Sequence, residues 1–380
     1  MKKLLCMLLA ALMVLTMASF AMAEEAASYK IAVMTGTTSQ GEEEPTTAAK
    51  LVETYGAGKV LYDTYPDNFS SEVETTISKL IAFASDPDVK AIIFVQGVQG
   101  AVSAFTQIKD SLGRDDILLI AGVPAEDPAD ISAAADIVLA VDEIGCGYQV
   151  ADKAAEWGCD VIVHYSFARH LSYETIVAKR DAMKMTAEGY GIEFVERDCP
   201  DPTGDAGMSG AQAAVLEDVP KVMQEYAGKK VCFYCTNCGI QVALQQAVLA
   251  AGDDAYYALP CCPSPFHGYQ EAFGLDATYG DIEGAITNLA NFLNESGAAG
   301  RFSTWAIPVN MSMINASYEY ACAYAEGKIE KVDEAFLTEC FSNAAGSEAV
   351  LGKYTNATGE ELANYYLIQF SPIDFNDYVG

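Results

Sequence analysis

The sequence predicts an α/β protein built from two doubly wound lobes joined by a hinge. Short apolar runs alternate with longer segments whose apolar residues recur at helical spacing, a rhythm typical of parallel sheets with right-handed crossovers. The alternation occurs in both halves of the chain. The 380 residues, 51% of them hydrophobic, suffice to fill two cores. We therefore expect two Rossmann-like lobes, each with a parallel sheet.

The first half of the chain predicts buried strands separated by helices. The strands are expected at residues 29–34, 59–62, 91–95 and 117–121. Helices are expected between them, at residues 45–55, 68–84 and 101–112. Gly122, Val123 and Pro124 end this pattern, and we interpret the small, acidic segment that follows as a crossover into the second lobe.

The second half repeats the alternation. Its strands are expected at residues 137–141, 161–163, 192–196, 231–235, 255–259 and 365–370. Its helices are expected at residues 148–157, 173–189, 239–251, 281–294 and 310–326. Ser172 is the expected N-cap of the helix from 173. We expect lobe one to comprise residues 24–124 and 308–362, and lobe two residues 125–307 and 363–380.

The N-terminus has the three-part pattern of a secretory signal peptide. Lys2 and Lys3 precede an apolar run over residues 4–17, and small residues follow up to Ala23. We expect residues 1–23 to be removed by cleavage after Ala23, which predicts an exported protein in the periplasm or at the cell surface. A retained membrane anchor is the alternative, although the run is short for a spanning helix. Cys6 is badly placed for lipoprotein processing.

The mature chain is strongly acidic. Removing the signal peptide takes away two lysines and leaves 20 basic residues against 53 acidic ones, a net charge near −33. Nucleic acids and anionic lipids are bound mainly by neutralising their negative charge, so both are poor partners for this chain. The expected state of the chain is a monomer.

The cysteine spacing permits two readings. Cys232, Cys235 and Cys238 form a C-x-x-C-x-x-C pattern with Cys261 and Cys262 downstream, which is compatible with zinc or an iron–sulfur cluster. The favoured reading is that such thiols pack as small hydrophobes in an apolar strand, so no cofactor or metal is expected. No nucleophile-elbow, zincin or P-loop pattern occurs, and we expect no enzyme; a His267 pairing with one of the downstream cysteines is a lesser alternative.

Residues 160–180 hold two of the three histidines of the chain in a loop that leaves a predicted strand. In open α/β sheets ligands bind at such loops. The ligand-binding candidates in this stretch are Tyr165, Ser166, Arg169, His170 and Arg180. The alternatives are core packing for Tyr165, loop capping for Arg169 and His170, and a surface ion pair of Arg180 with Glu174 or Asp181. His164 is expected to pack at the strand end.

Further candidates follow other strands. From the second lobe we expect Asn237, Ser264 and His267 to line the same cleft, and from the first lobe Thr37, Thr38 and Gln96. Asp201 and Asp205 lack the spacing of a calcium loop and are interpreted as turn residues. Trp305, near the proposed crossing at Pro308, is expected to pack at the hinge.

Four segments together resemble the type I periplasmic-binding superfamily, which includes ribose-binding-like receptors and the effector domains of lactose-repressor-like regulators. They are IAVMTGT, VDEIGCGYQVADKAAEWGCDVIV, KRDAMKMTAEGYGIEFV and VCFYCTNCGIQVALQQAVLAAG, in order within residues 29–328. Three more, HYSFARHLS, PDPTGDAG and PSPFHGYQEAFG, resemble an exported branch of that superfamily, a family of unknown function.

The resemblance implies two lobes that close over a ligand and three interlobe crossings. It matches Arg180 and Asn237 to ligand-binding positions of the family. Where sugar-binding members have acidic and basic clamps, this chain has Gly122-Val123 and Cys261-Cys262, which argues against a simple pentose or hexose.

The implied function is an exported solute-binding protein that delivers a small polar ligand to an ABC transporter. The alternatives are an extracytoplasmic sensory receptor acting on a membrane kinase or chemoreceptor and, less favoured, a thiolate metal-site protein.

Overall fold

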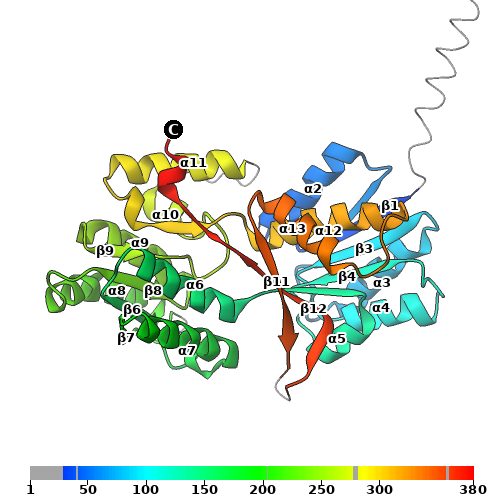
Figure 1. Ribbon diagram of the computed structural model, residues 1–380. Helices are drawn as coiled ribbons and strands as arrows, with labels where there is room; N and C mark the ends of the chain where they lie inside the picture. The colour runs from blue at the N-terminus through cyan, green and yellow to red at the C-terminus, as the bar shows by residue number, and fades with distance from the viewer. Residues whose placement is uncertain (1–28, 40–41, 203, 277–280, 357–358) are drawn as a thin grey trace, which may run out of the picture.

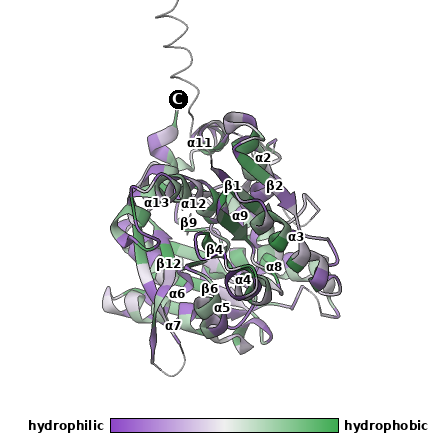
Figure 2. Ribbon diagram, turned by 90° about the vertical axis from the view of Figure 1, so that its right-hand side faces the viewer, coloured by the Kyte–Doolittle hydropathy of each residue, from purple (hydrophilic) through white to green (hydrophobic). Residues whose placement is uncertain are grey.

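The computed structural model describes residues 29–39, 42–202, 204–276, 281–356 and 359–380, which form two α/β lobes (Figure 1). The expected signal peptide, residues 1–23, lies outside the described residues. Among the described helices, none is long and apolar enough to cross a membrane. Figure 2, in which lobe one faces the viewer, shows hydrophobic segments toward the middle of the fold and hydrophilic ones mostly in the outer loops.

Lobe one is built on a seven-stranded sheet in the order β11-β12-β5-β4-β3-β1-β2. All neighbouring strands run parallel except β11, which pairs antiparallel with β12. The bounds are Lys30–Thr35 (β1), Val60–Thr64 (β2), Val89–Val95 (β3), Leu118–Gly122 (β4), Ile137–Val141 (β5), Ala349–Thr355 (β11) and Glu361–Phe370 (β12).

Helices cover both faces of this sheet because its strands are apolar on both sides. In β3, Ala91, Ile93 and Val95 pack with α2, α12 and α13, whereas Ile92 and Phe94 pack with α3, α4 and α5. The helices are Glu43–Tyr55 (α2), Val73–Ser85 (α3), Ala101–Asp110 (α4), Pro128–Ala134 (α5), Val309–Ala325 (α12) and Glu334–Ala345 (α13).

Lobe two contains a four-stranded parallel sheet in the order β7-β6-β8-β9. Its strands are Val161–Ser166 (β6), Glu193–Asp198 (β7), Val231–Cys235 (β8) and Ala255–Tyr257 (β9). Its helices are Glu143–Glu156 (α6), Glu174–Gly189 (α7), Gly207–Glu225 (α8), Cys238–Ala251 (α9), Tyr269–Phe273 (α10) and Ile282–Glu295 (α11). A short antiparallel pair, Ser303–Trp305 (β10) and Pro372–Asp374 (β13), and the 3₁₀ turns His170–Ser172, Ala299–Arg301 and Phe375–Tyr378 complete it.

The first sheet takes two strands that the sequence assigned to the second lobe. β5 pairs with β4 on one side and with β12 on the other, so both strands belong to lobe one, and β12 does so up to Phe370. The expected crossover after Pro124 is therefore wrong, because the buried run of β5 continues the first sheet before the chain leaves it. Ser172 is not the N-cap of α7 either: Tyr173 occupies that position, and the Ser172 hydroxyl donates to the Arg169 carbonyl at 2.6 Å.

The chain passes between the sheets at three places within the described residues, as the resemblance implies. It crosses between β5 and α6, between β10 and α12, and between β12 and β13 (Figure 1). Asp142 begins the first crossing, where its side chain accepts from the Gly145 amide at 2.8 Å and caps α6. Trp305, at the second crossing, is buried and donates to the Pro260 carbonyl at 3.2 Å, as expected for hinge packing.

Candidate functional site: the cavity between the lobes

A cavity of about 440 Å³ lies where the strand ends of the two lobes meet. Its lobe-one wall follows β3, β4 and β5 and includes the start of α2, and its lobe-two wall is the loop after β9. The lining residues are Glu42, Glu43, Glu44, Gln96, Val123, Val141, Cys262, Pro263, Ser264, His267 and Asn310. A larger hollow, of about 700 Å³, includes Tyr29 at the opposite end of β1. Because ligands of open α/β sheets bind at the carboxyl ends of the strands, the interlobe cavity is the candidate site.

A hydrogen-bond network centred on Glu44 forms the lobe-one wall. One carboxylate oxygen of this buried residue accepts from the Gln96 amide and from the Asn310 amide, each at 2.6 Å. Tyr65 donates to the Gln96 oxygen at 3.2 Å. Glu44 belongs to α2 and Asn310 to α12, whereas Gln96 and Tyr65 directly follow β3 and β2, so the network holds polar groups from four parts of lobe one in one arrangement before any ligand arrives.

Backbone strain is concentrated at the same wall. In the described parts of the chain, the non-glycine residues with positive φ are Gln96 at 56° and Val123 at 47°. Both line the cavity. A β-branched residue such as Val123 rarely adopts this conformation, and backbone strain tends to gather at functional sites. The strain therefore supports the assignment of this cavity as the site.

One hydrogen bond joins the two lobes across the cavity. The buried Ser264 hydroxyl donates to a Glu43 carboxylate oxygen at 2.7 Å. Burial raises the pKa of Glu43 to about 7 and the Glu44 charge adds to this rise, although the Ser264 hydrogen bond and the His267 charge oppose it. Glu43 can thus accept a hydrogen bond as a carboxylate or donate one as an acid near neutral pH.

The second lobe contributes a chain of polar side chains at the ends of β6 and β8. Ser166 contacts the Thr236 hydroxyl at 2.9 Å, and Thr236 contacts His170 Nδ1 at 3.1 Å. His170 Nε2 lies 3.2 Å from the Asn237 amide nitrogen. Asn237 Oδ1 accepts from the Gly239 amide at 2.8 Å and caps α9, which fixes the orientation of its side chain.

The orientation of Asn237 determines the tautomer of His170. An amide nitrogen only donates, so Nε2 of His170 accepts from Asn237 and Nδ1 carries the proton. Burial lowers the pKa of His170, and the Arg169 charge lowers it further, which keeps the ring neutral. The sequence-based candidates Ser166, His170 and Asn237 are thus brought together in one network, and their contact with a ligand stays a prediction.

Ser166, His170 and Asn237 are not among the residues that line the cavity, and neither are the other five sequence-based candidates. Tyr165 is buried in the lobe-two core and donates to Asp218 at 2.9 Å, in agreement with the core alternative. Thr37 hydrogen bonds with Ser39 at 2.7 Å and also with Asp67, and Thr38 is exposed. Ligand contact by Thr37 and Thr38 stays a prediction, as it does for the two arginines considered next.

Both candidate arginines have carboxylate partners. Arg169 binds Asp201 through Nε at 2.6 Å and Nη2 at 2.9 Å, a bidentate pair that joins the loop after β6 to the loop after β7. Arg180 contacts Asp181 and Glu196, each at 2.6 Å, which includes the expected surface ion pair with Asp181. In both arginines, the guanidinium group that was predicted to bind a ligand is therefore bonded to carboxylates of the protein itself.

The sequence did not single out Glu43, Glu44 and Asn310, although all three line the cavity. The acidic run at residues 42–44 directly after the loop of the first predicted strand was the available signal. Gln96, Ser264 and His267, which were predicted, do line it. The structure thus places three of the sequence-based candidates on the cavity wall.

Three side chains that can bind a metal through sulfur or nitrogen lie together at the edge of the cavity. One ligand atom each of Cys238, Cys262 and His267 lies within 4.8 Å of the others, and the two Sγ atoms are 2.7 Å apart. Cys261 Sγ lies 3.5 Å from Cys238 Sγ. Cys232 faces the opposite side of β8, against Cys159, because successive side chains of a strand alternate. Of the five cysteines in the sequence pattern, only Cys238 and Cys262 thus belong to this group.

Charge within this cluster is shared between thiols and imidazole. Hydrogen bonds from Cys261 and Cys262 hold the pKa of Cys238 far below its usual range, and His267 contributes to the lowering. Burial alone would lower the pKa of His267, yet its contacts with Cys238 and Cys262 raise it to about 11. The arrangement favours a thiolate beside a cationic or metal-bound imidazole.

The two lobes, their three crossings and the cavity at the strand ends define the type I periplasmic-binding fold, in agreement with the resemblance noted in the sequence. Residues 29–303 match a family described as a protein of unknown function (DUF3798), and the chain belongs to that family. Both the superfamily and the branch of unknown function predicted from the sequence are thus confirmed.

The chain is also similar to two curated proteins of unknown role. Two uncharacterised proteins of Treponema pallidum (strain Nichols) are 37% and 35% identical to the chain over 182 and 178 residues, which is 46% of this chain in each case and 81% and 79% of the relatives.

Among solved structures, a proposed transcriptional regulator from Clostridium difficile 630 has a TM-score of 0.82 at 19% identity, over 91% of this chain and 99% of that one. An ABC transporter periplasmic solute-binding protein from Actinobacillus succinogenes 130z with bound D-allose has a TM-score of 0.51 at 13% identity, over 92% and 99% of the two chains. These two likenesses concern the fold.

Proposed function

We propose that the protein is an exported solute-binding protein that closes its lobes on a small polar ligand and delivers it to a membrane ABC transporter. The observation that carries this proposal is the polar cavity at the hinge, where Glu44, Gln96 and Asn310 of one lobe face Ser264 and His267 of the other. Its location, its size and its preformed hydrogen bonds suit a ligand of a few polar groups.

The wall chemistry narrows the class of ligand. Glu43 and Glu44 offer carboxylate oxygens, so the lobe-one wall is rich in acceptors and suits a ligand that donates through hydroxyl or ammonium groups. The chain lacks the clamps of sugar-binding members at Gly122-Val123 and Cys261-Cys262, which argues against a simple pentose or hexose. D-Allose in the solved relative supports only a small-molecule ligand.

A sensory receptor is the second candidate, and one observation favours it. The similar Clostridium difficile chain is described as a proposed regulator and not as a transport protein. Lobe closure would serve either role, because a transporter and a membrane kinase can both recognise the closed form. Membranes that contain the cognate permease would accumulate ligand only if transport is the function.

The first test measures ligand binding by the mature chain, residues 24–380. Native mass spectrometry identifies what co-purifies, and thermal shift with polyols, amino acids, polyamines and nucleosides finds a ligand that raises the Tm. Glu44→Gln replaces the carboxylate that accepts two amide hydrogen bonds by a neutral amide. We therefore expect the ligand to bind at least about ten-fold more weakly, equivalent to about 1.4 kcal/mol.

Glu53→Gln is the matched control, because Glu53 is exposed on the same helix, α2. We expect it to bind as the wild type does. Wild-type affinity in Glu44→Gln would reject this cavity as the ligand site, provided that the ligand-free Tm of the variant shows that it folds.

A further inference from the structure

The loop after β9 folds over the first turn of α9 and brings three metal-ligating side chains together. Cys238 is the first residue of α9, and Cys262 and His267 belong to the loop. The Sγ–Sγ distance of 2.7 Å lies between the bond of about 2.05 Å in a disulfide and the separation of about 3.8 Å between two sulfurs bound at about 2.3 Å to a tetrahedral zinc ion. The two thiols would therefore move apart by about 1 Å to hold one zinc ion between them.

Buried glutamines fix this loop in position. Gln241 is fully buried; its oxygen accepts from the Cys261 amide at 2.6 Å and its nitrogen donates to the His267 carbonyl at 2.7 Å. Gln245, also buried, donates to the same carbonyl at 3.2 Å. One side chain thus holds both ends of the segment that carries Cys262 and His267 through their backbone.

Gly268 makes this arrangement possible. Its φ is +78°, and a Cβ there would come within 2.7 Å of both glutamine side chains. The loop can therefore lie directly on Gln241 and Gln245 only with glycine next to His267. The local sequence and packing therefore determine where Cys262 and His267 lie relative to Cys238.

We propose that Cys238, Cys262 and His267 hold one zinc ion, with the fourth coordination position facing the interlobe cavity. Two thiolates and a neutral imidazole balance the charge of a divalent ion, and zinc favours sulfur and nitrogen ligands in this number. Cys262 and His267 both line the cavity, so the fourth position opens toward the space where Glu43 and Ser264 meet.

This proposal goes beyond solute binding and departs from the sequence-based expectation that the protein has no cofactor or metal. Zinc with three protein ligands keeps a position for water or an exchangeable group. The ion would therefore form part of the lobe-two wall and could bind a donor atom of the solute directly. Cys261, whose thiol lies beside Cys238, would stay outside the ligand set.

The test uses the mature chain purified with a phosphine reductant and stripped with a chelator. Zn²⁺ is added in competition with a chromophoric chelator, and Co²⁺ is added separately as a spectroscopic probe. We expect one equivalent of zinc, a Tm rise of several degrees and the sulfur-to-cobalt charge-transfer absorption of a thiolate site. Cys238→Ser, Cys262→Ser and His267→Gln should each weaken zinc binding at least about 100-fold.

Cys322→Ser is the matched control, because Cys322 is a half-buried thiol in α12 of lobe one, and it should bind zinc as the wild type does. Absence of stoichiometric zinc binding by the reduced wild type overturns the proposal. So does a Cys238–Cys262 disulfide, found by mass spectrometry as the main form, together with a reduced form that does not bind zinc.

The zinc proposal and the solute proposal fail separately. If Glu44→Gln loses solute binding and the wild type binds no zinc, the solute site stands and the metal site is rejected. If the wild type binds zinc and Glu44→Gln binds the solute as the wild type does, the metal site stands and the solute site in this cavity is rejected.

Discussion

His164 illustrates how a titratable side chain can serve packing alone. Its ring lies between Phe194, at a centroid distance of 5.7 Å, and Tyr234, at 6.0 Å, and the residue is 1% exposed. Its Nδ1 has no hydrogen-bond partner among the residues that the structure describes. Burial, together with the charges of Arg180 and Lys179 on α7, lowers the pKa of His164 to about 3. The ring is therefore neutral throughout the physiological range, as expected for a packing residue.

This depressed pKa predicts a specific loss of stability in acid. Between pH about 6.5 and about 3 the unfolded chain binds a proton at His164 and the folded chain does not, so the free energy of unfolding falls as the pH falls, by up to about 1.4 kcal/mol per pH unit. His164→Phe keeps the aromatic packing and removes this effect. Urea unfolding at pH 7, 6 and 5 should show that the free energy of unfolding falls more steeply with falling pH in the wild type than in the variant. Equal slopes for the two proteins would contradict the prediction.

Arg169, unlike His164, has a partner that the sequence did not predict. The sequence offered it as a donor to a ligand, but the Asp201 carboxylate accepts two of its hydrogen bonds. Asp201 was interpreted as a turn residue, and its partner lies 32 positions earlier in the chain. No local pattern encodes such a pair.

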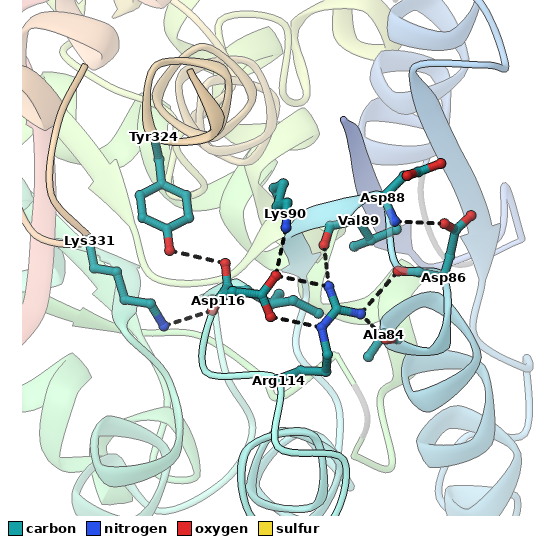
Figure 3. Close-up of polar contacts among 10 residues, drawn as sticks. Ala84, Asp86, Asp88, Val89, Lys90, Arg114, Asp116, Tyr324 and Lys331 are labelled. Carbon is teal, nitrogen blue, oxygen red and sulfur yellow. Dashed lines mark hydrogen bonds and ion pairs between the residues drawn. The ribbon is translucent and has the colours of Figure 1, made fainter. Parts of the chain in front are cut away.

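Among the elements, the loop between α4 and β4 is fastened by one side chain, Arg114 (Figure 3). Its guanidinium donates to the Ala84 and Asp86 carbonyls at the end of α3 and, at 2.8 Å, to the Val89 carbonyl of β3. Asp116 orients it through Nε at 2.8 Å. Arg114 thus supplies charged donors to carbonyls at a helix end and a strand start, including the Ala84 carbonyl in the last turn of α3.

We expect Arg114→Ala to lower the free energy of unfolding by about 2–3 kcal/mol, because several carbonyls lose charged donors at once. Arg114→Lys should recover only part of this loss, because an ammonium group cannot reproduce the planar fork. Guanidinium chloride unfolding measures both, with Lys184→Ala on the exposed side of α7 as the control. A change below about 0.5 kcal/mol in Arg114→Ala would show that the contacts are not stabilising.

For the whole molecule, the contact between Ser264 and Glu43 links lobes whose sheets are otherwise separate. We expect the lobes to rotate about the three crossings, and this hydrogen bond to favour the closed arrangement together with that of the Val309 amide to the Pro263 carbonyl at 3.0 Å. It joins residues 221 positions apart in the sequence. This contact can form only when both lobes are folded and docked, so we expect it to contribute to closure.

Ser264→Ala should shift the ligand-free protein toward open forms. The variant leaves the largely buried Glu43 carboxyl without its interlobe partner in the closed form, at a cost of about 1 kcal/mol, or about five-fold in the closing equilibrium. Small-angle X-ray scattering should give a larger mean radius of gyration for the variant than for the wild type and for Ser78→Ala, an exposed control on α3. Equal radii would contradict a role of this contact in closure.

Local patterns predicted most of the elements correctly, because the period of apolar residues reports burial on one or both faces of a strand or helix. The run at 91–95 became β3 and the run at 231–235 became β8. The assignment of β5 and β12 to a lobe failed, since a strand of this kind carries no local mark of the sheet that it joins. Gln96, Ser264 and His267 were predicted as cavity residues because each follows a strand, and their place on the wall agrees with that reasoning.

The order of buried strands, the acidic surface and the resemblance to a two-lobed binding fold were all present in the amino-acid sequence, because each depends on composition or on neighbours a few residues away. The partners of Arg169, the joining of Glu44 with Gln96 and Asn310, and the meeting of Cys238 with Cys262 and His267 were decided by tertiary structure. Each of these contacts closes a long stretch of chain, and only the packing of helices on two sheets determines which polar groups then face one another.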